Sequence, residues 1–241
     1  MAVPVFLQQM SLGGAPQLDS FTLISQEKEG YNFAANAYFR NVQAGDFLVK
    51  MSSAGQQNMI LRSLPAGWIS LSTANVGAYR YTAAMKIADG SENNTQGPAL
   101  MSLSGGANGL TYTADYSVVL RPSTPLLTIS DPLSGNGSVF FHVASGGSLG
   151  SVTLPLSRFT VPSIYFAFLH KDSTTANISS DISVTSGLSF SLSGSAGGDN
   201  TAGAFKIGIV NSGPVATTIN HTNNAGGSYP AICRAVVNVT V

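Results

Sequence analysis

The chain has 241 residues, with eleven basic and eleven acidic side chains, so charged residues make up only 9% of it. Average soluble domains contain about 25%, and this sparse, balanced charge gives no electrostatic reason to bind nucleic acid or an anionic membrane. A chain of this length buries about 70–75% of its unfolded surface, so it needs no disulfide or metal to fold. Its single cysteine, Cys233, excludes an intrachain disulfide and a multi-cysteine zinc site.

Residues 1–18 mix apolar side chains with glycine and proline and show no periodicity, which suits either an extended N-terminal arm that lies on another surface or a frayed terminus. We expect the extended arm, packed on another subunit, because a frayed segment would expose several large apolar side chains to water. The segment has no basic n-region, so we expect no signal peptide. No apolar run approaches the ~20 residues that span a bilayer. We therefore expect the protein to fold in the cytoplasm in which it is synthesised. Residues 19–241 are expected to form one domain.

Short alternating segments separated by turn residues occupy the first half of this domain. Successive side chains of a strand point to opposite sides of a sheet, so this period of two predicts half-buried antiparallel strands. The clearest example is Tyr79–Ala88, which follows a Pro-Ala-Gly-Trp corner (residues 65–68), a second strand and an Asn/Gly turn. The charged run Gln26–Glu29 is interpreted as a solvated turn. Other predicted strands are Phe21–Ile24, Phe33–Phe39, Phe47–Met51, Leu100–Leu103 and Tyr116–Leu120.

The second half repeats this pattern. Its predicted strands are Val139–Val143, Ser151–Leu154, Ile164–Leu169, Leu188–Ser193, Phe205–Ile209, Val215–Ile219 and Ile232–Val241. No window has helical spacing with caps, and turn residues recur throughout. Many short strands of this kind predict an all-β fold: a single antiparallel β-sandwich.

Candidate catalytic and metal-ligating residues do not form a recognisable pattern. Gly146–Gly150 matches G-x-S-x-G around Ser148, but a nucleophile elbow requires a helix next, whereas a strand is predicted. The histidines His142, His170 and His221 lack zinc-binding spacing. The oxygens of Asp89 and Glu92 lie in a turn-rich loop without the regular acidic spacing of a calcium loop. We therefore predict no catalytic, cofactor or metal site and no enzyme activity.

Two readings remain for the aromatic residues. Trp68 is expected to pack over a sheet corner rather than to form a sugar platform. Loop tyrosines near Asn75–Tyr81 and Ser228–Pro230 are the candidates if the domain binds a glycan.

Three motifs resemble a recurring group of tailed-phage structural proteins. They are Gly45-Asp46 before a hydrophobic-Leu-Val strand, Pro65-x-Gly67-Trp68, and Tyr81-x-x-Ala84-x-Lys86-x-Ala88 followed by Glu92. The chain departs from the group's pattern at Ile232 and Cys233, where a tryptophan is expected. The resemblance implies a jelly-roll-like sandwich and carries no catalytic residues across.

This resemblance implies a non-enzymatic virion component, such as a capsid decoration, collar, tail or fibre-associated protein. Its expected partners are other virion proteins and copies of itself in a homo-oligomer, with the virion as its location after synthesis in the bacterial cytoplasm. The alternative is a carbohydrate-binding β-sandwich module that recognises a host glycan.

Overall fold

The computed structural model describes the residues listed at the end of this paragraph. Every regular element in them is a β-strand, all named pairings are antiparallel, and these residues contain no helix, so none that could span a membrane. The all-β prediction is therefore confirmed for this part of the chain. The described ranges are 18–30, 37–54, 59–76, 79–103, 113–130, 140–143, 152–154, 163–172, 182–183, 188–193, 202–210, 217–221 and 228–240.

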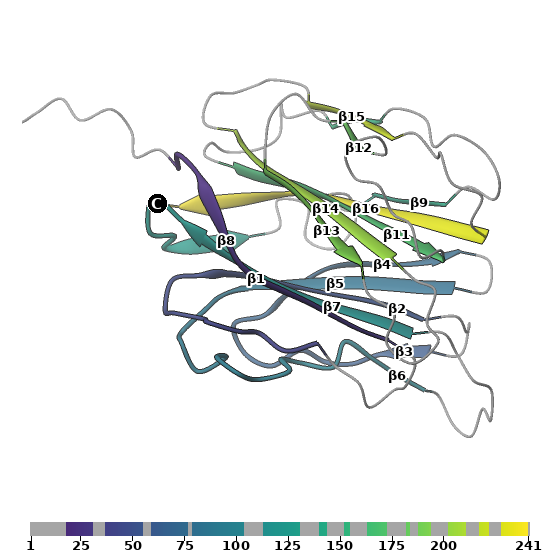
Figure 1. Cartoon of the computed structure of the whole chain (residues 1–241), viewed down its shortest axis with the longest axis horizontal. Coiled ribbons are helices and arrows are strands. Elements are labelled where there is room, and N and C mark those ends of the chain that lie inside the picture. The colour runs from purple at the N-terminus through teal and green to yellow at the C-terminus, as the bar shows by residue number, and fades with distance from the viewer. Residues whose placement is uncertain are drawn as a thin grey trace, which may run out of the picture.

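The N-terminal half forms a five-stranded sheet (Figure 1). Its edge strand β1 pairs with β7, about a hundred residues further along the chain, so this edge of the sheet depends on a contact between distant parts of the sequence. The order across the sheet is β1 (Phe21–Gly30), β7 (Thr113–Pro122), β2 (Phe47–Ala54), β5 (Tyr79–Ile87) and β4 (Ile69–Val76).

The C-terminal half supplies a six-stranded sheet, centred on β11 and the long last strand β16. The order is β13 (Leu188–Ser193), β14 (Ala202–Val210), β11 (Ser163–Asp172), β16 (Ser228–Thr240) and β8 (Thr128–Ser130), with β9 (Phe140–Val143) also on β16. Two small sheets join β10 (Val152–Leu154), β15 (Thr217–His221) and β12 (Ile182–Ser183), and β3 (Met59–Leu61) with β6 (Met101–Leu103).

Most predicted strands are confirmed, but the short strands β3, β8 and β12 were not predicted, and other details also differ. Gln26–Glu29 lies inside β1 and is not a turn. Of Phe33–Phe39, residues 33–36 lie outside the described ranges, and Phe39 makes only an isolated bridge with Thr95. Ser228–Pro230 begins β16 rather than lying in a loop. For Gln26–Glu29 and Ser228–Pro230, tertiary contacts decided the conformation, because local composition favours turns for charged or proline-containing runs only weakly.

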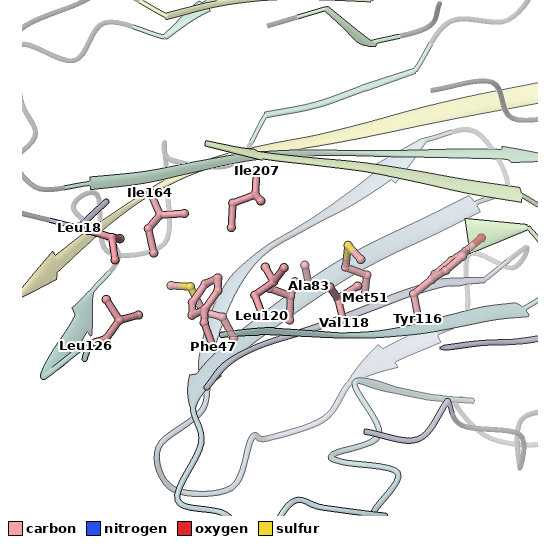
Figure 2. Close-up of a cluster of buried hydrophobic side chains, with 12 residues drawn as sticks. Leu18, Phe47, Met51, Ala83, Tyr116, Val118, Leu120, Leu126, Ile164 and Ile207 are labelled. Atoms are coloured by element: carbon pink, nitrogen blue, oxygen red, sulfur yellow. The ribbon is translucent and has the colours of Figure 1, made fainter. Parts of the chain in front are cut away.

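The main hydrophobic cluster draws on both large sheets (Figure 2). Phe47, Val49 and Met51 alternate along β2 into this cluster, where Ile164 of β11 and Ile207 of β14 also lie. Contacts of β1 with β13, of β4 with β9 and of β5 with β8 also join the two sheets. The remaining buried members are Leu18, Ala83, Met85, Tyr116, Val118, Leu120 and Leu126.

The other face of the five-stranded sheet is also buried. Two segments, residues 37–46 and 88–100, contact it, and we call them the cover segments. Phe39, Val42 and Ala88 from these segments form a second hydrophobic cluster with Leu48 of β2 and Val119 of β7. Residues 47–51 of β2 are therefore protected from water on both sides of the sheet, so the polar side chain among them, Lys50, must find partners within the protein.

Candidate functional site

The Gly-Asp motif links a cover segment to β7 through a buried aspartate that pairs with an arginine. Gly45 has a φ of +90°, which suits glycine, and it precedes Asp46, whose exposed fraction is 1%. Asp46 Oδ1 accepts a hydrogen bond from Arg121 Nε at 2.8 Å, and Oδ2 accepts one from Arg121 Nη2 at 2.9 Å. The hydrogen bond from Arg121 to Asp46 raises the pKa of the guanidinium. This two-point contact fixes the cover segment to the end of β7.

The Lys and Glu of the third motif form a second ion pair, which links β5 to the cover segment 88–100. The Lys86 ammonium contacts Asp89 Oδ2 at 2.7 Å and also Glu92 Oε1. Glu92 is buried, and its Oε2 accepts hydrogen bonds from the backbone N–H groups of Asp89 and Gly90, both at 3.2 Å. Burial lowers the pKa of Lys86, but the hydrogen bonds and charges of Asp89 and Glu92 raise it by more. The two carboxylates considered as calcium ligands are thus paired with a cation.

The Pro-x-Gly-Trp corner packs against these elements. Gly67 has a φ of +83°, and a Cβ there would lie 3.1 Å from Lys86 Cε, so the lysine stem crosses directly over the glycine. The Trp68 ring lies 5.8 Å from the Phe39 ring, and the side chain is half-buried. Trp68 therefore packs over the sheet as expected, although its burial is only partial.

Among the described residues, the most deeply buried polar side chain is Lys50, and sequence reasoning missed the network around it. The Lys50 side chain is fully buried, and its Nζ lies 2.5 Å from Asp115 Oδ2. The ammonium also donates to the carbonyl oxygens of Ala37 at 2.9 Å and Gln96 at 2.8 Å, and to Ser117 Oγ at 3.1 Å. Both cover segments are therefore held to β2 by one amino group.

Asp115 completes this network. Its Oδ1 accepts a hydrogen bond from Ser52 Oγ at 2.5 Å, and its Oδ2 accepts one from the Ala37 N–H at 3.0 Å. Burial raises the pKa of the Asp115 carboxyl, while Lys50 and the two hydrogen-bond donors oppose that rise. In the sequence, Lys50 and Ser52 alternate with core residues on β2, but only the structure shows that they lie opposite Ser117 and Asp115 on β7.

The other sequence candidates are not brought together. Ser148 lies outside the described residues, and the element after it is the strand β10, not a helix. His142, His170 and His221 lie on three different strands, β9, β11 and β15. Within the described ranges, no group of three or more His, Cys, Asp or Glu side chains is placed to hold a metal ion. Asn75–Tyr81 spans the ends of β4 and β5, with residues 77 and 78 outside the description.

The chain matches no family model, no curated protein and no solved structure.

Proposed function

We propose that the protein is a non-enzymatic structural component of a phage virion, built as a jelly-roll-like β-sandwich from the two large sheets. The observation that carries this proposal is that the motif residues make structural contacts. Asp46 and Glu92 form ion pairs and Gly67 packs closely against Lys86, and these contacts hold the cover segments to the sheet. Residues that resemble those of phage structural proteins thus serve a structural purpose in this chain as well.

The proposed mode of action is burial of surface between subunits. Interface cores are depleted in charged residues, and only 9% of this chain is charged. Its partners are copies of itself in a symmetric homo-oligomer and neighbouring virion proteins. No nucleic acid, membrane, metal or organic cofactor takes part in this mechanism.

The test is to locate the protein on the particle. Virions of the encoding phage, purified by density gradient, are expected to contain the chain at a fixed copy number by quantitative mass spectrometry. Cryo-electron microscopy of the same particles is then expected to show density for it at one repeated position. If the chain is absent from washed virions but abundant in the lysate, the proposal is wrong.

A glycan array with the purified chain separates the carbohydrate-binding alternative from this proposal. Subunit association without glycan binding supports the structural role. Saturable binding to one glycan class by a monomeric chain that is absent from virions supports the alternative.

A further inference from the structure

The buried pair Lys50–Asp115 places an amine against a carboxyl group with water excluded. Lys50 has no exposed side-chain surface, Asp115 side-chain exposure is 9%, and Nζ lies 2.5 Å from Oδ2. The carboxyl carbon is bonded to that oxygen, so it lies close to the separation of about 3–3.5 Å at which an oriented nucleophile reacts. The two residues are on adjacent strands, β2 and β7, whose register fixes the pair.

Burial also destabilises the ionised form of the carboxyl group. Removing a carboxylate from water costs several kcal/mol, which favours the carboxylic acid. Burial raises the pKa of Asp115 in the same direction. Transfer of one proton from Nζ to Oδ2, which are in contact, gives a neutral amine, the nucleophilic form of lysine.

We propose that Lys50 and Asp115 condense after folding to an intramolecular amide that covalently joins β2 to β7. The neutral Nζ attacks Cγ and forms the N–C bond. A second proton passes from Nζ to Oδ2, the Cγ–Oδ2 bond breaks, and one water molecule leaves. Oδ1 becomes the amide oxygen, and the third proton stays on the amide nitrogen. The reaction needs no oxidant or co-reactant.

Neighbouring groups suit each part of this step. The Ser52 hydroxyl donates to Oδ1, where negative charge develops when Nζ adds to Cγ, and so acts as an oxyanion donor. The Ala37 N–H orients Oδ2, the oxygen that leaves. The carbonyl oxygens of Ala37 and Gln96 and the Ser117 hydroxyl hold Nζ in position.

The pair Lys86–Asp89 is an internal control. Its charges are also in contact, but the Asp89 side chain is 59% exposed. Water solvates that carboxylate and keeps it ionised, so no amide is expected there. Lys86 also contacts the buried Glu92, but the two carboxylates raise the pKa of Lys86 and keep it an ammonium, so no amide is expected with Glu92 either.

The test is mass spectrometry of the purified, folded full-length chain after denaturation. We expect an intact mass lower than the sequence mass by one water molecule. We also expect a proteolytic peptide pair joined through Lys50 and Asp115, while peptides containing Lys86 and Asp89 carry no such link. An intact mass equal to the sequence mass after prolonged incubation of the folded chain overturns the proposal, and so does a link at any other pair.

Two serine variants test the assigned roles. Ser52→Ala is expected to slow linkage roughly a hundredfold, the effect of losing one oxyanion donor. The control Ser25→Ala removes a hydroxyl of β1 that donates to the Arg40 carbonyl oxygen, away from Lys50 and Asp115, and leaves the linkage rate unchanged. Equal rates in both variants, measured on chains that show the same strand signal by circular dichroism, refute the role of Ser52.

Discussion

Gly97 lies where the cover segment 88–100 passes over the Phe39 ring. Its φ is +67°, and an added Cβ would lie 2.6 Å from Phe39 Cε2. Gly97→Ala therefore combines backbone strain with a collision against a buried ring, and we expect it to reduce the free energy of unfolding by about 3 kcal/mol. Urea denaturation of the variant measures this value.

Gly45→Ala is the matched control for this prediction. Gly45 also has a positive φ, +90°, but nothing lies within 4 Å of its added Cβ. Only the backbone term remains, about 1–2 kcal/mol. If the two variants lose equal stability, the packing of Phe39 over Gly97 is not as described.

Trp68→Ala tests the aromatic corner. Deleting a fully packed large aromatic costs about 3–5 kcal/mol, and half-burial places this residue below that range, at about 2 kcal/mol. The expected result is a lower melting temperature by calorimetry, with unchanged subunit association. Unchanged melting combined with loss of glycan binding would instead identify Trp68 as a ligand platform.

At the scale of single residues, the sequence predicted packing better than pairing. Trp68 after Pro-Ala-Gly indicated a packed corner because a large ring at a strand start has a sheet face beside it. The partners Asp46–Arg121 and Lys50–Asp115 are separated by more than sixty positions. The register of β2 and β7 brings Lys50 and Asp115 together, and the path of the cover segment over the sheet brings Asp46 to Arg121. A single sequence specifies neither of these.

Among the elements, the loop that carries Glu92 depends on one lysine at the end of β5. The folded pKa of Lys86 lies above its unfolded value. The charged lysine therefore stabilises the fold fully below the unfolded pKa of about 10.4, and this stabilisation is lost as the pH rises through the folded pKa.

Lys86→Met is expected to leave the Glu92 carboxylate buried without its cation, at a cost of about 3 kcal/mol at neutral pH. Urea midpoints measured from neutral pH upward are expected to converge for wild type and variant above the folded pKa. Asp89→Asn, at the exposed end of the same cluster, is the control and is expected to shift the midpoint only slightly. A constant difference between wild type and Lys86→Met at every pH contradicts this account.

Strand positions followed from alternation with few errors because period two is a local property. The charged run in β1 was interpreted wrongly for a physical reason. Its Glu27 is satisfied by Arg40 Nε at 2.7 Å and by the Tyr38 N–H at 2.8 Å, both from a cover segment. β1 is also an edge strand, where charged side chains discourage pairing with other chains.

For the whole molecule, the boundary of the proposed N-terminal arm has a structural marker. Leu18 is fully buried in the main cluster (Figure 2), so it contributes to the chain's own core. Deletion of residues 1–17, with Leu18 retained, is expected to leave melting near that of the full chain but to abolish self-association. Sedimentation velocity measures the second effect. A truncated chain that associates normally or fails to fold shows that residues 1–17 do not serve as an assembly element that packs on a neighbouring subunit.

Sheet order was beyond the reach of the sequence, because alternation specifies strands but not their neighbours. β1 lies beside β7, and β16 lies between β11 and the strands β8 and β9. Such arrangements depend on the summed burial of both sheets rather than on any one segment.

These same long connections determine the order in which the strands can pair during translation. β1 has no partner until β7 is made, and at roughly 5–20 residues per second that interval lasts several seconds on the ribosome. The six-stranded sheet waits longer, because its internal strand β16 (Ser228–Thr240) is translated after β8, β9 and β11, the strands that pair with it. A chain that is truncated before Ser228 therefore lacks the strand with which β8, β9 and β11 all pair. Those strands are then left with unpaired edges, which promote aggregation.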